Sequence, residues 1–325
     1  MDASGAPVSG SKLPLPARMA RFLRERFPLE VHGASILIFF LTNSAVAQVT
    51  TNREDAPIAF GLRSLVAAVV LSLMFLRLRL FDEVKDYEHD RVHNPRRPLP
   101  RGLLTPREVN LWAAATAVVE GALSAALGPA AVGAFLLVLA FTLLMRFEFF
   151  CRDLIRSRLL TYALIHTPSG GLIGLFVFCA VTGVPLWQAP RAMLYYVLAG
   201  WSLLMVFELA RKTYDPATEP GPDTYSSVFG ARGAALLNAA LVMLSTLLIW
   251  ATAAVALQDS VRKFSTLLWG LTAVVLSIDA RYYLDPRPET ARYVRFSAQA
   301  YLGLASLLLA LELILARGLA LRAGG

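Results

Sequence analysis

The sequence is short of charged residues and of cysteine. Only 17% of its 325 residues are Asp, Glu, Lys or Arg, whereas 56% are hydrophobic. A soluble globular domain rarely combines so little charge with so much apolar sequence, and this balance argues against a soluble protein. Cys151 and Cys179 form neither a disulfide framework nor the spacing of a zinc site, so we expect two free thiols.

No secretory signal, internal repeat or low-complexity tract is visible. Instead, apolar stretches recur at about the 20-residue length that a helix needs to cross a bilayer. Because lipid offers the backbone no hydrogen bonds, and strict alternation is missing, these stretches predict helices rather than a barrel. We predict an all-α, polytopic membrane helix bundle of about nine transmembrane helices, around a central cavity open near the cytoplasmic side. The spans are expected near residues 31–50, 60–81, 108–128, 130–150, 159–182, 190–210, 234–257, 264–284 and 296–317.

The basic residues are distributed unevenly between the two predicted sides. Under a nine-span topology, 22 Lys and Arg fall on the side of the N-terminus and 7 on the other. This bias places the N-terminus and the charged loops in the cytoplasm, and the chain in an inner or plasma membrane. It explains the net charge of +8 without a nucleic-acid partner and makes membrane lipid the expected neighbour.

The N-terminal segment 1–27 is predicted to be disordered or amphipathic, and residues 28–325 to form a single transmembrane domain. Residues 1–17 are rich in Pro, Gly and Ser, while residues 18–30 mix Arg with Phe and Leu. The second pattern is typical of a helix that lies on a membrane surface. A solvated basic tail is the alternative.

Carboxylates gather where the second predicted span ends, in FDEVKDYEHDRVHNPRRPLPRG at 81–102. On one continuous helix, Asp82, Glu83, Asp86 and Asp90 lie within an arc of about 100°. Like charges at these spacings repel, so the arrangement is costly unless cations neutralise it. Oxygen ligands suit Mg²⁺ before Ca²⁺, and Mg²⁺ leaves positions for water and phosphate. The cluster predicts a Mg²⁺-bridged phosphate or diphosphate, with an internally ion-paired helix end as the alternative.

Basic residues follow this cluster and recur in the loop after the fourth span. Prolines stop the helix, and arginines suit direct contact with phosphate oxygens. The candidate diphosphate-binding residues are Arg91, Arg97, Arg101, Arg152 and Arg156, together with Lys212. For the two arginines near residue 154, a positive-inside loop explains the pattern equally well.

A second cluster ends the sixth span, in FELARKTYDPATEPGPDTYSSVFGARGA at 207–234. Glu208, Lys212 and Asp215 share one helix face, and Pro216 ends the helix. Asp223 lies in a turn before TYSS, which can cap the next helix. An ordinary ion-paired helix exit is the alternative.

The first stretch resembles the first aspartate-rich motif of the UbiA-type intramembrane prenyltransferases, Asn-Asp-x-x-Asp-x-x-x-Asp followed by basic, proline-rich residues. Asp82 stands at the Asn, Glu83 at the first Asp, and Asp86 and Asp90 at the other two. The resemblance implies that two acidic motifs face each other over a membrane-embedded cavity. There, two or more Mg²⁺ ions hold an isoprenoid diphosphate, whose ionisation gives an allylic carbocation that alkylates an acceptor, often aromatic.

The second motif departs from the family pattern of Asp-x-x-x-Asp. Glu208 occupies the first acidic position and Lys212 the second. Three interpretations stay open: Lys212 binds diphosphate directly, Asp215 replaces the missing ligand, or Asp223 does so from the loop. The candidate metal ligands are Asp82, Glu83, Asp86, Asp90, Glu208, Asp215 and Asp223, and the catalytic candidates are Glu83, Asp86, Asp90, Glu208 and Lys212.

Other polar residues in the spans admit two interpretations. His166 can act as a base or bind an acceptor, although a satisfied core histidine is the simpler explanation. Tyr162 and Asn43 can mark a cavity or join helices by hydrogen bonds.

Prenyl transfer to a small aromatic acceptor is the expected function. A terpene cyclase on the same scaffold is the alternative, because a changed diphosphate cradle need not serve the same substrate. A transporter predicts acids at mid-membrane depth, whereas these acids lie at helix ends.

Overall fold

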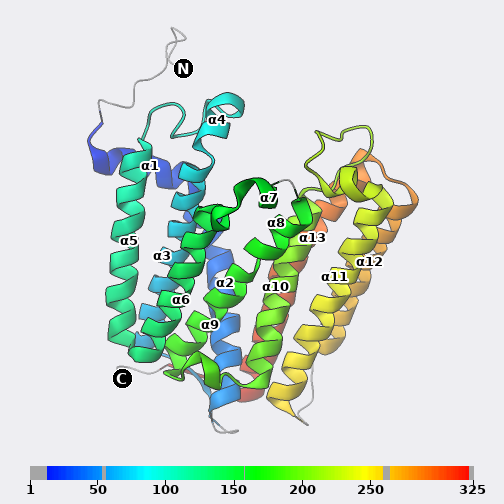
Figure 1. The fold of residues 1–325 in the computed structure, drawn as a ribbon. Coiled ribbons are helices and arrows are strands. Elements are labelled where there is room, and N and C mark those ends of the chain that lie inside the picture. The colour runs from blue at the N-terminus through cyan, green and yellow to red at the C-terminus, as the bar shows by residue number, and fades with distance from the viewer. Residues whose placement is uncertain (1–12, 53–55, 157, 259–263, 322–325) are drawn as a thin grey trace.

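The computed structural model describes residues 13–52, 56–156, 158–258 and 264–321. They form helices almost throughout, joined by short connections (Figure 1). The α-helices are α1 (Leu15–Arg26), α2 (Leu29–Thr51), α3 (Leu62–Lys85), α4 (Tyr87–His93), α5 (Pro106–Leu127), α6 (Pro129–Arg146), α7 (Arg152–Arg156), α8 (Leu159–His166), α9 (Pro168–Thr182), α10 (Arg191–Arg211), α11 (Tyr225–Leu257), α12 (Ser265–Leu284) and α13 (Pro288–Arg317). Two 3₁₀ turns, η2 (Glu148–Phe150) and η3 (Leu186–Gln188), and two strands, β1 (Ile58–Phe60) and β2 (Leu319–Leu321), complete the described part.

Within the described residues, nine helical segments are long and apolar enough to cross a membrane, with α8 and α9 together forming the fifth. This confirms the prediction of an all-α, polytopic bundle. Large apolar side chains such as Leu111, Val118 and Leu136 are exposed on the outside of the helices. In lipid this exposure carries no penalty, because acyl chains are as apolar as leucine.

The bundle is built around α2, which contacts α3, α9, α10, α11 and α13. Figure 1 shows α2 in the middle of the ribbon. Small residues let α9 approach this helix closely: a Cβ added at Gly174 would lie 2.6 Å from Asn43 Oδ1. The Asn43 side chain also donates a hydrogen bond to the Phe39 carbonyl. Asn43 therefore belongs to helix packing.

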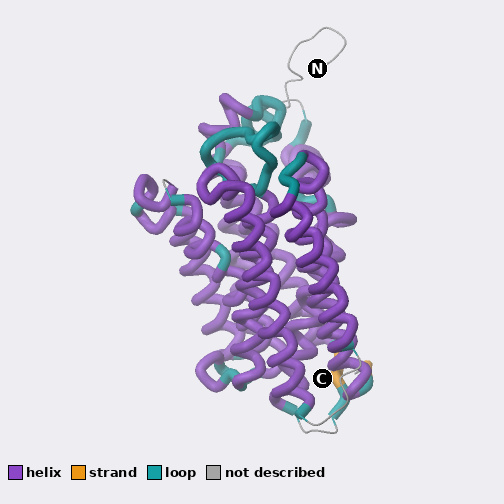
Figure 2. Tube along the Cα trace, turned by 90° about the vertical axis from the view of Figure 1, so that its right-hand side faces the viewer, coloured by secondary structure: helices purple, strands orange, loops and turns teal. Residues whose placement is uncertain are grey.

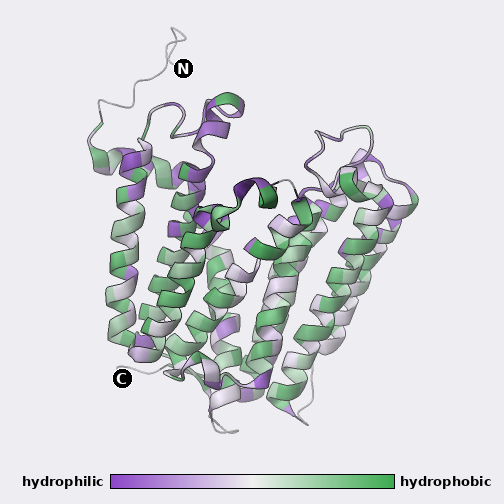
Figure 3. Ribbon diagram, viewed as in Figure 1, coloured by the Kyte–Doolittle hydropathy of each residue, from purple (hydrophilic) through white to green (hydrophobic). Residues whose placement is uncertain are grey.

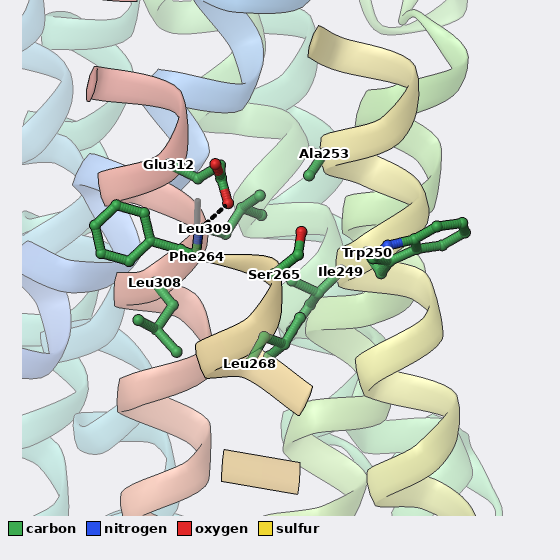
Figure 4. Close-up of a pocket in the computed structure, with 9 residues that line it drawn as sticks. All are labelled: Ile249, Trp250, Ala253, Phe264, Ser265, Leu268, Leu308, Leu309 and Glu312. Atoms are coloured by element: carbon green, nitrogen blue, oxygen red, sulfur yellow. Dashed lines mark hydrogen bonds between the residues drawn. The ribbon is translucent and has the colours of Figure 1, made fainter. Parts of the chain in front are cut away.

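Hydrophilic residues gather at one end of the bundle, which carries α1, α4, α7 and the loop from Lys212 to Thr224 (Figure 3). We call it the charged end. At the opposite end, β1 and β2 pair in parallel beside the C-terminus (Figure 2). There the buried Glu312 carboxylate accepts a hydrogen bond from the Phe264 backbone N–H, 2.8 Å away, where α12 begins (Figure 4). This acid has a capping role far from the acidic motifs.

The N-terminal segment packs onto the bundle through α1. Residues 1–12 lie outside the described part, so their predicted disorder stays a prediction. Met19 and Phe22 of α1 are buried against Leu80 of α3 and Val109 of α5. Arg18 adds an ion pair with Glu108. The amphipathic face predicted for a membrane surface thus covers the protein's own helices.

Candidate active site

The first acidic stretch is divided between two helices. α3 ends at Lys85, and α4 begins at Tyr87 after Asp86, whose φ of −91° and ψ of 2° interrupt the helix. The expectation of four carboxylates on one arc is therefore wrong. Glu83 and Asp90 are buried, whereas the Asp82 side chain is 53% exposed.

Glu83 is enclosed by two guanidinium groups. Its Oε1 lies 2.6 Å from Arg26 Nε of α1 and 2.8 Å from Arg79 Nη2 of α3. These contacts balance the carboxylate and fasten α1 to α3. They place Glu83, predicted from the sequence as a metal ligand and catalytic residue, in a structural ion-pair network.

Asp90 holds the proline-rich loop. Its Oδ2 accepts a hydrogen bond from Arg97 Nη1 at 2.6 Å, and its Oδ1 accepts one from Asn94 Nδ2 at 3.0 Å. Both oxygens are thus occupied by the loop that follows α4. Asp90 and Arg97 hold each other in a local turn.

The remaining candidate arginines also pair with protein carboxylates. Arg101 pairs with Glu25 of α1, and Arg91 forms an exposed pair with Glu88 on its own helix. Arg152 of α7 pairs with Glu148. Arg156 ends α7, and its side chain lies outside the described part. None of these described guanidinium groups reaches the second motif through a contact seen in the described residues.

A groove of about 450 Å³ lies at the charged end between α1 and the loop after α4. Arg26 and Arg97 line it, but both are already paired with Glu83 and Asp90. Its lining residues are Glu25, Arg26, His93, Asn94, Pro95, Arg96, Arg97 and Pro98. The groove contains no residue of the second motif.

In the second motif, cations surround the single helical carboxylate. Glu208 Oε2 accepts a hydrogen bond from Arg211 Nε at 2.5 Å, and its Oε1 lies 3.4 Å from Lys212 Nζ. Oε1 has no hydrogen-bond donor among the described residues. One acid between two cations gives this helix end a net positive charge.

Asp215 closes a turn after α10. It accepts hydrogen bonds from the backbone N–H groups of Ala217 and Thr218 and from the Thr218 hydroxyl. Burial raises the pKa of this carboxyl, but the Thr218 hydroxyl and the backbone donors outweigh burial and hold the pKa below its usual value. Because these hydrogen bonds occupy its oxygens, the structure gives no support to the interpretation that Asp215 replaces the missing ligand.

Asp223 is exposed in the loop before α11, so the third interpretation of the second motif gains no support. The adjacent Thr224 accepts a hydrogen bond from the Ser227 backbone N–H and caps α11, as the sequence predicted. In the described residues, the loop between α10 and α11 therefore serves to connect these two helices and to cap α11.

Two lysines from opposite motifs converge on one tyrosine of α8. Lys85 Nζ donates a hydrogen bond to the Tyr162 hydroxyl at 3.2 Å and lies 3.2 Å from Asp82 Oδ1. Lys212 Nζ lies 5.9 Å from the centroid of the same ring. We call Lys85, Tyr162 and Lys212 the lysine–tyrosine cluster. It shows that the ends of α3 and α10 meet across α8, as two facing motifs require.

His166 extends this cluster into the bundle. Its ring stacks on Tyr162 with centroids 3.9 Å apart, and its Nδ1 lies 2.8 Å from the Tyr162 carbonyl oxygen. A carbonyl only accepts, so Nδ1 carries the proton and Nε2 presents a lone pair. Nε2 is buried without a hydrogen-bond partner among the described residues.

Lys212 is a candidate from the sequence, because it stands at an acidic position of the motif, whereas Lys85 stands at a variable position inside the acidic stretch and the sequence does not single it out. The sequence also does not pair Tyr162 with His166 directly. Their four-residue spacing in the fifth span, which puts both on one helix face, was the available signal.

The UbiA prenyltransferase family model matches residues 37–307 of this chain. The chain belongs to the UbiA prenyltransferase family. The match covers both acidic motifs, seven of the candidate spans completely, and parts of the first and the last, so the lysine–tyrosine cluster lies within the family domain. No curated protein matches the sequence.

Solved structures of UbiA homologues share the fold of this chain at low sequence identity. A structure of digeranylgeranylglyceryl phosphate synthase in membranes has a TM-score of 0.67 and 16% identity, covering 92% of this chain and 99% of that one. A UbiA homologue from Archaeoglobus fulgidus bound to GPP and Mg²⁺ has a TM-score of 0.59 and 16% identity, covering 88% and 99%. One from Aeropyrum pernix K1 has a TM-score of 0.58 and 20% identity, covering 82% and 95%.

Magnesium fits the first motif of this UbiA-family chain better than the second. Among the described residues, no three acidic, histidine or cysteine side chains are grouped to hold a metal. Mg²⁺ needs fewer, since one or two carboxylates suffice when water and phosphate fill the other positions. Asp82 and Asp86 are one helical turn apart, joined by a backbone hydrogen bond, and suit this role. Glu208, with Arg211 and Lys212 beside it, does not.

Proposed function

We propose that this protein ionises an isoprenoid diphosphate with the help of Mg²⁺ and transfers the prenyl group to a small, aromatic acceptor. The observation that carries the proposal is the meeting of two acidic motifs and two lysines at Tyr162, in a chain of the UbiA prenyltransferase family. The Archaeoglobus fulgidus homologue of the same fold was solved with GPP and Mg²⁺, which supports the substrate class.

The residues of the cluster suit the bond-breaking step. The C–O bond of the substrate breaks with its electron pair on the diphosphate, so negative charge grows on the leaving oxygen. Magnesium held by Asp82 and Asp86 would neutralise part of the negative charge that develops on the leaving diphosphate. Lys85 and Lys212 place fixed ammonium groups beside the same region, where low dielectric strengthens their effect. The apolar spans beside the site would limit the access of water to the carbocation.

The proton released by the acceptor needs a base. When an aromatic carbon attacks the carbocation, the new C–C bond forms and the ring loses one proton. His166 Nε2 has an available lone pair, and the hydrogen bond from Nδ1 to the Tyr162 carbonyl fixes the ring. We assign this role to His166 within the proposed reaction.

A terpene cyclase is the second candidate, and the altered second motif favours it. Where Glu208 is neutralised by Arg211 and Lys212, the diphosphate is held differently from a cradle of two acidic motifs. A changed position of the leaving group lets the substrate's own double bonds reach the carbocation. Ionisation would then need no acceptor.

Pyrophosphate release by the purified protein in detergent tests both candidates. Geranyl, farnesyl and geranylgeranyl diphosphates are supplied with Mg²⁺ or EDTA, with and without aromatic acceptors, and organic products are extracted. Release that depends on Mg²⁺ and an acceptor supports the transferase. Release of a cyclic product without an acceptor identifies a cyclase. An Asp285→Ala variant, which removes a half-exposed acid at the charged end outside both motifs, should release pyrophosphate as the wild type does. No release from any diphosphate would refute the proposal.

We also propose that the charged end faces the cytoplasm of a plasma or inner membrane. Cys151 is exposed at that end, whereas Cys179 is buried, so one native thiol reports the orientation. A membrane-impermeant maleimide should label Cys151 in inside-out vesicles and leave it unlabelled in intact cells. Cys151→Ser provides the background. Labelling in intact cells would reverse the orientation.

A further inference from the structure

We infer that Lys212 and Lys85 together replace a second metal ion, so that diphosphate is held by one Mg²⁺ at Asp82 and Asp86 and by two ammonium groups beside Tyr162. This inference rests on the proposed function, because it names how that substrate is held. The inference adds how many metal ions bind the diphosphate and which lysine side chains take the place of a second one.

The described residues of the second motif are poorly suited to a divalent ion. Among them, Glu208 is the one carboxylate on α10, and it already contacts Arg211 at 2.5 Å and Lys212 at 3.4 Å. Asp215 binds its own turn. A metal ion at Glu208 would meet two positive charges at short range, and their repulsion opposes binding.

Lys212 is held toward the centre of the site. A lysine at a helix end normally extends its ammonium group into water. Here the side chain is only 25% exposed, with Nζ between Glu208 and the Tyr162 ring. Arg211 binds the other oxygen of Glu208, so two cations share one acid. Positive charge remains for an anionic ligand.

Lys85 places a second ammonium group at the same tyrosine from the opposite motif. Its side chain is 11% exposed, and Nζ lies 3.2 Å from both the Tyr162 hydroxyl and Asp82. A Mg²⁺ ion that takes Asp82 oxygen would relieve Lys85 of that partner while Tyr162 still holds it. The first metal and the lysine pair would thus act on the same diphosphate.

Counting bound metal tests the inference without measuring turnover. Mn²⁺ replaces Mg²⁺ at oxygen ligands and is counted by electron paramagnetic resonance on the full chain in detergent, with inorganic pyrophosphate as the probe. We expect one pyrophosphate-dependent Mn²⁺ per wild-type protein. Lys212→Asp recreates an acidic pair with Glu208 and should raise the number to two.

Pyrophosphate affinity, measured by titration calorimetry with Mn²⁺, tests the lysines directly. Lys212→Met and Lys85→Met should each weaken binding about tenfold or more, since each removes a charge-assisted contact. Arg292→Met, which removes an exposed cation on α13 near the same end, should leave affinity unchanged. Circular dichroism establishes that each variant is folded.

Two results separate the possible failures. Two Mn²⁺ ions in the wild type, with unchanged affinity in Lys212→Met, would overturn the lysine inference and leave the proposed function standing. No pyrophosphate binding to the wild type under any metal condition would overturn both.

Discussion

The buried pair Arg77–Glu120 lends itself to a quantitative prediction. Arg77 of α3 donates from Nε to both Glu120 oxygens of α5, at 2.9 and 3.0 Å, and from Nη1 to Thr142 of α6 at 2.6 Å. Both charged side chains are completely buried. Glu120→Gln would leave the Arg77 charge enclosed without a counter-ion.

The expected loss of unfolding free energy is about 3–5 kcal/mol, the usual result of removing one partner from a buried ion pair. The exposed pair Arg91–Glu88 provides the control, because Glu88→Gln should change stability by about 1 kcal/mol or less. Unfolding in detergent by denaturant, followed by circular dichroism, measures both.

The double variant Arg77→Met with Glu120→Leu sharpens the test. Arg77 Nη2 has no hydrogen-bond partner among the described residues. The contacts of the ion pair therefore do not fully offset the free energy needed to remove both charges from water. We therefore expect the double variant to be at least as stable as the wild type. A Glu120→Gln protein whose unfolding free energy lies within about 1 kcal/mol of wild type, or a double variant less stable than wild type, would refute the reasoning.

Three further predictions follow from the acidic residues. Glu83→Gln should loosen α1, seen as faster proteolysis near Arg26, while Mn²⁺ binding stays unchanged; a lost metal ion would restore Glu83 as a ligand. Asp86→Ala should abolish Mg²⁺-dependent pyrophosphate release, whereas Asp90→Ala should lower it less, because Asp90 positions the loop; equal losses would contradict this division. The pKa of Asp215 is lower in the folded protein than its ordinary value of 3.8, so the ionised carboxylate stabilises the fold at neutral pH. This stabilisation is lost as the pH falls below 3.8 and through the lower pKa of the folded state. Between neutral and acid pH, the unfolding free energy of Asp215→Asn should therefore fall less than that of wild type. Equal decreases in the two proteins would exclude this role for Asp215.

Much of the fold could be predicted from the sequence because the physical signals are local. A run of about 20 apolar residues specifies a spanning helix by itself, since lipid leaves the backbone no other partner. The fifth span, predicted over 159–182, has those limits in the structure. Thr224 as a helix cap and the two free thiols were equally local features and are confirmed. The break at Asp86 was missed, because no proline or glycine marks it.

The roles of the acidic side chains were decided by tertiary structure. Glu83 and Asp82 are neighbours in sequence, yet Glu83 meets Arg26 of α1 while Asp82 meets Lys85. The sequence by itself determined where carboxylates and lysines are concentrated. Which of them are neutralised, and which remain for a ligand, depends on counter-ions brought by distant helices. The electrostatic interaction between two groups weakens with distance and with solvation, so its strength depends on the folded structure. Lys85, for example, forms a hydrogen bond with Tyr162, which is 77 residues away in sequence.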